Sequence, residues 1–270
     1  MKYKVIQGKE FNLAKFDPND TSLWSQGKKS AKERIKDLRK QLINLQQVLW
    51  AEEKHKILIV LQAMDSGGKD GTIRSIFKGV NPQGVKVANF RIPTEEELSH
   101  DYLWRVHQHV PGKGEMVIFN RSHYEDVLVV RVHNLVPPAV WKKRYGHIRN
   151  FEKTLSDEGT VILKFFLHIS KNEQKQRFIE RIEVPEKQWK FNPNDLDERK
   201  RWDEYLDAYQ DAIRKTSTRQ ALWFVIPANR NWYRDLMILE IITDSLKQLN
   251  MKYPASVENI RSYRDLLLNE

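Results

Sequence analysis

Residues 62–72 constrain the fold of this chain more than any other stretch of its sequence. They contain Gly67-Gly-Lys-Asp-Gly71, follow the apolar run at 57–61 and precede a predicted helix. A strand, a glycine-rich turn and a helix in this order form a phosphate cradle, because the N–H groups of the turn and the positive end of the helix point at an anion. In such a cradle Lys69 reaches a terminal phosphate. The alternative is a Gly-Gly turn followed by a solvated lysine.

The turn departs from the usual pattern G-x-x-x-x-G-K-[ST] at two positions. Ala63 replaces the first glycine, and Asp70 replaces the Ser or Thr whose hydroxyl normally binds magnesium. An additional carboxylate, Asp65, lies inside the turn. Because the strand and the helix that the motif requires are both predicted, we interpret the turn as a phosphate loop with rearranged metal ligation. The residues expected to bind phosphate here are Ser66, Gly67, Gly68, Lys69, Asp70, Gly71 and Thr72.

Length and composition are those of one large α/β domain spanning residues 1–270, of which 40% are apolar. No stretch approaches the roughly 18–20 apolar residues of a membrane span. The sequence has no cysteine, and its first residues lack the apolar run of a signal peptide, so we expect a cytoplasmic protein. The net charge of +10 favours a polyanionic partner, namely nucleic acid, an acidic membrane surface or polyphosphate. Charge alone does not choose among the three.

Strands and helices are predicted to alternate after an N-terminal extension and helix in residues 1–50. Such alternation implies a doubly wound, parallel five-stranded sheet between two layers of helices. Residues 177–215 include a polar, charged segment bracketed by Pro185 and Pro193, which we interpret as a helical lid. The predicted strands are 56–61, 85–90, 116–119, 160–169 and 222–226, and the predicted helices after residue 50 are 70–78, 94–109, 138–157, 170–183 and 232–249.

Polar side chains follow the third predicted strand, at the edge where ligands gather in an open parallel sheet. The sequence there is Asn120-Arg-Ser-His-Tyr-Glu-Asp126. Phosphate-loop enzymes usually place an acidic metal ligand at the end of this strand, but here the position holds Asn120, and Glu125 and Asp126 follow. Arg121 is a fixed cation able to grip a phosphate with two hydrogen bonds. The alternative is a helix N-terminus whose acids complement the helix dipole.

Two further strand ends carry candidate side chains. Arg91 follows the second strand, and His100 and Asp101 come shortly after it, where a phosphate acceptor would bind; both are equally consistent with an ordinary helix surface. Arg177 and Arg181 follow the fourth strand and share one helix face. Two arginines beside a phosphoryl-transfer site neutralise charge on the transferred group, whereas the alternative is surface ion pairs with neighbouring glutamates.

Several motifs in one order, from the first predicted helix to the last, closely resemble the polyphosphate kinase 2 family. They lie at residues 67–72, 81–84, 98–104, 119–126, 164–168 and 177–181. The resemblance implies a P-loop kinase-like fold related to thymidylate kinases. It also implies transfer of phosphoryl groups between inorganic polyphosphate and nucleotides with Mg²⁺, for which Mn²⁺ substitutes, and a homodimer or homotetramer.

The sequence at 120–126 is similar to that of the class III subgroup, which phosphorylates both nucleoside mono- and diphosphates. The resemblance ties this acceptor range to Glu125. It further implies that Asp65 and Asp126 hold the metal, that Lys69 and the loop amides hold the phosphates, and that three arginines stabilise the charge of the transferred group. The nucleotide-binding set is then Arg91, His100, Asp101, Asn120, Arg121 and Glu125, the charge-stabilising arginines are Arg121, Arg177 and Arg181, and the cations expected along polyphosphate are Arg74, Lys78 and the lid lysines.

The function expected from the sequence is therefore a polyphosphate kinase acting on AMP and ADP, with ATP as a product, and on GMP and GDP. Two alternatives stay open at this point, an ATP-dependent nucleoside monophosphate kinase and a non-catalytic nucleic-acid-binding module. Asp65, Glu125 and Asp126 argue against a nucleic-acid partner, because three carboxylates repel a phosphate backbone unless a cation intervenes.

Overall fold

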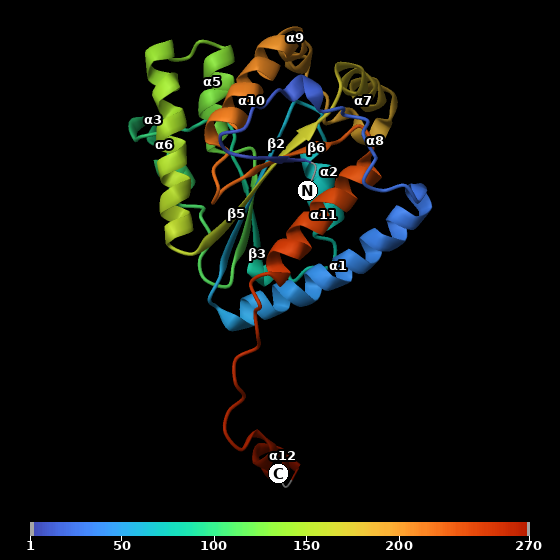
Figure 1. The fold of residues 1–270 in the computed structure, drawn as a ribbon, viewed down its shortest axis with the longest axis vertical. Coiled ribbons are helices and arrows are strands. Elements are labelled where there is room, and N and C mark those ends of the chain that lie inside the picture. Colours follow the sequence, from blue (N-terminus) through green and yellow to red (C-terminus); the bar gives the residue numbers. More distant parts are fainter. Residues whose placement is uncertain (1–2, 269–270) are drawn as a thin grey trace.

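A six-stranded sheet forms the centre of the molecule, for which a computed structural model describes residues 3–268. The strand order is β1-β6-β5-β2-β4-β3, and all neighbouring strands run parallel except β1, which is antiparallel to β6. Helices cover both faces, which gives three layers (Figure 1). The strands are β1 (Lys4–Val5), β2 (Lys56–Ala63), β3 (Val85–Asn89), β4 (Met116–Asn120), β5 (Thr160–His168) and β6 (Trp223–Pro227).

Strand β2 lies at the middle of the sheet, paired with β4 on one side and β5 on the other. Residues 57–61 of this strand are at most 1% exposed. A strand with helices over both faces has no solvent side, so its sequence is a continuous apolar run instead of an alternating one. This explains why the run before the phosphate loop was recognisable as a buried strand.

Two helical layers enclose the sheet. On one side, α1 (Gly27–Glu52) packs along α11 (Asn231–Lys247), and α11 also contacts α2 (Lys69–Ile76). On the other side lie α5 (Val129–Val132), α6 (Pro138–Asp157) and α10 (Trp202–Thr216). Leu38, Leu42 and Leu49 recur at helical spacing in α1 and are fully buried, so this helix packs against the core through one apolar stripe.

The sheet has one strand more than the predicted five. Strand β1 adds two residues to the edge of β6, with Lys4 opposite Phe224. The N–H of Val225 donates to the carbonyl oxygen of Tyr3 at 2.9 Å and extends this pairing. A two-residue strand is too short to show a period of two in the sequence. The prediction of an α/β sheet with helices on both faces is confirmed, but the sheet is mixed at this edge.

The single helix predicted over 94–109 was wrong, because the structure has α3 (Glu95–Ser99) and α4 (Trp104–His107) there. A capping box opens α3: the N–H of Glu97 donates to Thr94 Oγ1 at 3.2 Å, and the Glu97 carboxylate accepts from the N–H of Thr94. The helix stops after Ser99, and the Asp101 carboxylate accepts from the N–H of Leu103 at 2.9 Å. Aspartate side chains compete in this way with helical hydrogen bonds and start new turns.

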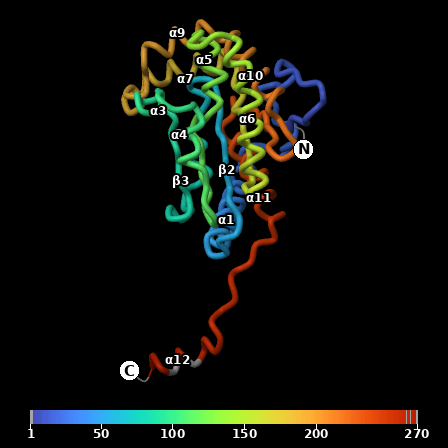
Figure 2. Tube along the Cα trace, turned by 90° about the vertical axis from the view of Figure 1, so that its left-hand side faces the viewer, coloured from blue at the N-terminus to red at the C-terminus, as the bar shows by residue number. Residues whose placement is uncertain are grey.

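Segment 177–215 is helical, as predicted for the lid region. It comprises most of α7 (Lys171–Glu183), then α8 (Pro185–Gln188), α9 (Asn194–Lys200) and most of α10. Short 3-10 turns occur at η1 (Leu13–Lys15), η2 (Pro82–Gly84) and η3 (His123–Val127). An arm after α11 leads away from the body to α12 (Ile260–Leu268), which was not predicted (Figures 1 and 2). Within residues 3–268, no helix has the length and apolarity needed to cross a bilayer.

The packing of α1 generates a stability prediction. Leu42→Ala should lower the free energy of unfolding by about 2–5 kcal/mol, because a fully buried leucine is replaced by a cavity. Urea unfolding followed by circular dichroism measures this change. Lys36→Ala, on the exposed face of the same helix, is the matched control and should shift stability by less than about 0.5 kcal/mol. Equal effects of the two substitutions would contradict the packing described.

Candidate active site

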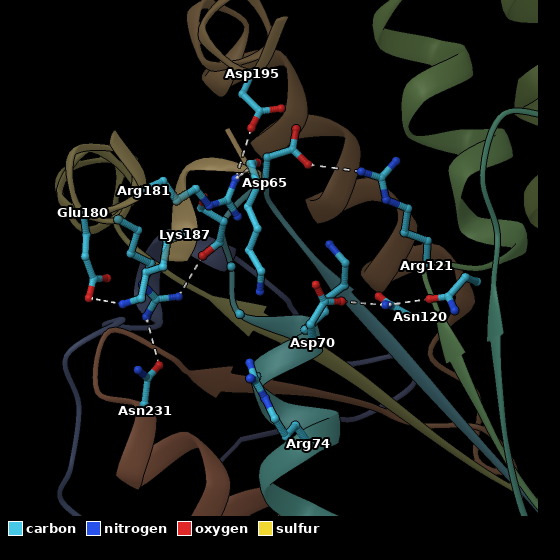
Figure 3. A pocket seen from close by; sticks show the side chains of 18 of the residues that line it. Asp65, Asp70, Arg74, Asn120, Arg121, Glu180, Arg181, Lys187, Asp195 and Asn231 are labelled. Carbon is cyan, nitrogen blue, oxygen red and sulfur yellow. Dashed lines mark hydrogen bonds and ion pairs between the residues drawn. The ribbon is translucent and has the colours of Figure 1, made fainter. Parts of the chain in front are cut away.

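A cavity of about 650 Å³ opens at the carboxyl end of β2, where the loop at 64–68 leads into α2. Loop residues form its floor, and its walls come from the ends of β3 and β4, from α7 and α8, and from the start of α11 (Figure 3). The sheet order changes direction beside β2, since β4 lies on one side of it and β5 on the other. Ligands in doubly wound sheets bind at such a switch point.

The loop requires glycine at two positions. Gly68 has φ of +97°, and a Cβ on it would lie 2.4 Å from Arg234 Nη1. A Cβ on Gly67 would lie 2.7 Å from the carbonyl oxygen of Met64, to which the N–H of Gly67 donates at 2.9 Å. Ser66 adopts a left-handed conformation with φ of 60°, which is uncommon outside glycine. Because Gly68 has no side chain, the guanidinium groups of Arg234 and Arg177 can lie against the backbone of the loop.

Lys69 is the first residue of α2 and points back over the loop. Its ammonium donates to the carbonyl oxygen of Ala63 at 3.3 Å. Burial lowers the pKa of Lys69, and the positive charge of Arg121 lowers it further. An anion between these two cations would relieve their repulsion, so the positions of Lys69 and Arg121 favour phosphate binding.

Arginines from two further elements converge on the same loop. Arg177 of α7 donates to the carbonyl oxygens of Ser66 at 2.9 Å and Ala228 at 2.6 Å, and its Nε donates to Glu173 at 2.8 Å. Arg177 therefore forms the ion pair with a neighbouring glutamate and also contacts the phosphate loop. Arg181, one turn later, donates to Asp195 of α9 at 3.2 Å.

Arg234 of α11 is a site cation that sequence reasoning missed. It is 3% exposed, donates to Asp235 at 2.9 and 2.7 Å, and reaches Asn231 at 2.8 Å. Burial lowers the pKa of Arg234. Arg234 and Asn231 follow β6, so the rule applied to the other strand ends would have identified them.

A smaller cavity of about 280 Å³ lies next to the first one. Asp65, Lys69 and Arg121 line both cavities, and Asp65 accepts from Arg121 at 3.3 Å (Figure 3). Glu125 lines only the smaller cavity; burial raises its pKa, while Arg121 and Lys69 oppose that shift. The smaller cavity also has the side chains of Tyr205 and other residues of α9 and α10 in its wall, which the sequence did not indicate.

Asn120 connects the end of β4 to two neighbours. Its amide donates to Asp70 of α2 and to Asn89 of β3, both at 2.8 Å (Figure 3). The next residue, Arg121, has φ of 63°, which turns the chain out of the strand and aims the guanidinium at Asp65. Asn120 thus links β4 to α2 and β3 by donating two hydrogen bonds, which an ionised carboxylate at this position could not do.

The structure gathers most of the predicted site residues around the two cavities and leaves five out. Thr72 is buried, its hydroxyl donating to the carbonyl oxygen of Gly68, and Lys78 is exposed. His100 stacks on Trp104 at 4.2 Å, and Asp101 holds the turn described above. Asp126 is the fifth. Those that line at least one cavity are Asp65, Ser66, Gly67, Gly68, Lys69, Asp70, Gly71, Arg74, Arg91, Asn120, Arg121, Glu125, Arg177 and Arg181.

Asp126 faces α6 and accepts from Arg144 at 2.7 Å. Burial raises its pKa to about 6, with Arg144 opposing the shift. The residues described contain no cluster of three or more His, Asp or Glu side chains arranged to hold a metal ion. Mg²⁺, however, commonly binds through one or two carboxylates plus substrate phosphates. Asp65 and Glu125, which line the same cavity, fit that requirement better than the predicted pair of Asp65 and Asp126.

Comparisons with known proteins agree with this geometry. Residues 25–254 match the model of the family described as polyphosphate kinase 2. An AMP/ADP-polyphosphate phosphotransferase of Meiothermus ruber is 61% identical over 94% of this chain and 95% of its own length. An ADP-polyphosphate phosphotransferase of Rhodopseudomonas palustris is 41% identical over 93% of this chain and 91% of its own.

A solved structure has the same fold. The crystal structure of polyphosphate kinase 2 from Arthrobacter aurescens TC1 superposes with a TM-score of 0.96 at 40% identity, covering 100% of this chain and 96% of the other. The family model spans most of the sequence and includes the phosphate loop, the end of β4 and the arginines of α7. The chain therefore belongs to the polyphosphate kinase 2 family.

Proposed function

We propose that this protein transfers a phosphoryl group between inorganic polyphosphate and purine nucleotides, with AMP and ADP as acceptors, GMP and GDP as their guanine equivalents, and ATP among the products. The observation that carries the proposal is the wall shared by the two cavities. Asp65, Lys69 and Arg121 border both spaces, together with Ile92 and Asp195, so a phosphoryl donor in one cavity and an acceptor in the other would meet at this wall.

The larger cavity suits polyphosphate. Lys and Arg side chains outnumber Asp and Glu among the residues that line it, and they come from the loop, the strand ends and the lid region. An inorganic chain that carries negative charge along its whole length requires such a continuous positive wall. Lys187 and Lys190 of the lid region line this cavity, as do Arg74 and Arg91. Binding of polyphosphate should weaken with rising ionic strength.

Catalysis then rests on position and charge. The loop amides and Lys69 hold the phosphates, while Arg121, Arg177 and Arg181 neutralise charge on the equatorial oxygens of the transferred group. Arg234 joins them, since it approaches Gly68 from above the loop. Asp65 would hold Mg²⁺, and the ion would supply further neutralisation of the phosphate charge. No covalent intermediate is required, because the two cavities hold donor and acceptor at the same side chains.

The smaller cavity suits the nucleotide acceptor. It combines the carboxylate of Glu125 with the aromatic side chains of Tyr205 and Tyr209 and with the amide of Gln174. Such mixed polar and aromatic walls are typical of sites for small organic ligands. The names of the Meiothermus and Rhodopseudomonas relatives, which specify AMP or ADP as well as polyphosphate, support this assignment.

The donor is tested with purified protein, AMP, Mg²⁺ and long-chain polyphosphate in the absence of ATP. ADP, and then ATP, should accumulate as measured by ion-exchange chromatography. Replacing polyphosphate by ATP as the only donor separates this enzyme from an ATP-dependent nucleoside monophosphate kinase. Phosphorylation of AMP from ATP alone, with none from polyphosphate, would overturn the proposal.

Lys69→Ala should lower kcat by about two to four orders of magnitude, because it removes the ammonium that both cavities share. The thermal midpoint should stay close to that of the parent protein. Lys78→Ala is the matched control, since Lys78 lies two residues beyond α2, is exposed and lines neither cavity. Steady-state rates with polyphosphate and AMP measure both variants. A Lys69→Ala enzyme with parent-like activity would contradict the cradle assignment.

Glu125→Asn should reduce transfer to AMP more than transfer to ADP. The substitution removes a carboxylate from the smaller cavity and changes no residue that lines the larger one. Ratios of kcat/KM for the two acceptors measure the effect, and Glu158→Asn, on an exposed position after α6, controls for loss of negative charge. Equal losses with AMP and ADP would separate Glu125 from acceptor choice.

A further inference from the structure

A buried polar cluster lies behind the segment that presents Arg121 and Glu125 to the site. Lys164 of β5 and Glu152 of α6 form its centre, with 2.6 Å between Nζ and Oε2. Both side chains are shielded from solvent, at 0% and 1% exposure. Neither lines either cavity, so substrate does not touch them and the mechanism above does not use them.

The Lys164 ammonium has a partner for each of its three N–H bonds. It donates to Glu152 at 2.6 Å, to the hydroxyl oxygen of Tyr124 at 2.9 Å and to the carbonyl oxygen of Thr216 at 2.9 Å. The Tyr124 hydroxyl in turn donates to the other carboxylate oxygen of Glu152 at 2.7 Å. Because a lysine ammonium has three donors, every N–H bond of Lys164 is used, and the hydroxyl of Tyr124 is held between Lys164 and Glu152.

Lys164 and Glu152 each favour the ionised form of the other. Burial opposes ionisation of Glu152, but the neighbouring Lys164 lowers the pKa of Glu152 below its ordinary value. The cluster also reaches His123, whose Nε2 lies 3.3 Å from Glu152. The ring of Trp223 packs edge-on against Tyr124 at 4.7 Å between centroids. Tyr124 and His123 are thus held through both their polar and their apolar atoms.

Glu125 follows these two anchored residues directly in the short helix η3. The chain has just left β4 through the left-handed turn at Arg121, which by itself leaves the course of the next residues open. A buried ion pair gains little stability over apolar packing of the same volume, but its directional bonds fix one arrangement. Glu125 has its own hydrogen bond to Gln62 at the site, and its backbone continues directly from the anchored Tyr124.

We propose that Tyr124 is a positioning residue for the acceptor side of the active site, held in place by Lys164 and Glu152. Its hydroxyl fixes the register of η3, and η3 sets where the Glu125 carboxylate lies in the smaller cavity relative to Lys69 and Arg121. Glu152 and Lys164 act through Tyr124 and not on substrate. The inference rests on the proposed function, because it assigns Glu125 to the acceptor.

Tyr124→Phe tests the inference, since it deletes one hydroxyl and keeps the ring against Trp223. We expect kcat with AMP to fall on the order of tenfold to a hundredfold, because misplacing a site group by about 1 Å has effects of that size. The KM for polyphosphate should change much less, and the loss with ADP should be smaller than the loss with AMP. Glu152→Gln, which keeps the side-chain shape, should change the AMP-to-ADP ratio in the same direction.

Tyr3→Phe is the matched control. Tyr3 is also a buried tyrosine with a hydrogen-bonded hydroxyl, next to β1 at the opposite edge of the sheet from β3. All rates are measured well below the thermal midpoint of each variant, so that only folded protein is compared. Tyr3→Phe should shift the midpoint without altering the AMP-to-ADP ratio.

The outcomes separate the two hypotheses. A parent enzyme that makes no ADP from AMP and polyphosphate would remove the proposed function itself. An active parent with an unchanged AMP-to-ADP ratio in folded Tyr124→Phe would overturn the positioning role. If Tyr124→Phe fails to fold, Glu152→Gln decides, and an unchanged ratio there has the same meaning.

Discussion

The site depends on how closely cations approach the backbone of the phosphate loop. Arg234 and Arg177 occupy the space that a side chain at Gly68 would need, and Lys69 returns over the loop from α2. Like charges this close repel one another, so each is held by fixed acceptors. Asp235 holds Arg234, and Glu173 with two carbonyl oxygens holds Arg177. On the proposed function, these contacts would keep the cations in place before substrate binds and so reduce the reorganisation required in the transition state.

Different elements support the two proposed sides of the reaction. The side proposed for polyphosphate is built from the loop, α7 and α11, whose arginines donate to backbone carbonyls and to carboxylates at the site itself. The side proposed for the acceptor includes η3, which is anchored from behind by residues of α6 and β5 that are closed to solvent. On this proposal, substitutions behind η3 should alter acceptor geometry, whereas substitutions above the loop should alter phosphate binding.

Much of this architecture followed from local patterns. Nearly continuous apolar runs mark β2, β4, β5 and β6, because a strand covered on both faces has no polar side, whereas the edge strand β3 contains the exposed Lys86. The N-terminal helix was predictable because leucines such as Leu38 and Leu42 recur at helical spacing and form its buried stripe. The prediction failed in two places, one where a side chain competed with helical hydrogen bonds and one where a strand was very short. Asp101 divided a predicted helix by bonding to the backbone of Leu103, and β1 is too short to show a period.

The sequence by itself determined the phosphate loop, its lysine and the strand ends that carry functional side chains, because backbone geometry at a strand–turn–helix unit depends on neighbouring residues. Only the tertiary structure decided which polar side chains face the ligand. Asp126 and Glu125 are adjacent in sequence, yet one bonds to Arg144 of α6 and the other lines the smaller cavity. Arg234 reaches the loop from 166 positions after Gly68 (234 − 68) because α11 begins beside it. Such convergence depends on how helices pack across the sheet; the sequence marks Arg234 only as a residue that follows the end of a strand, not as one that approaches Gly68.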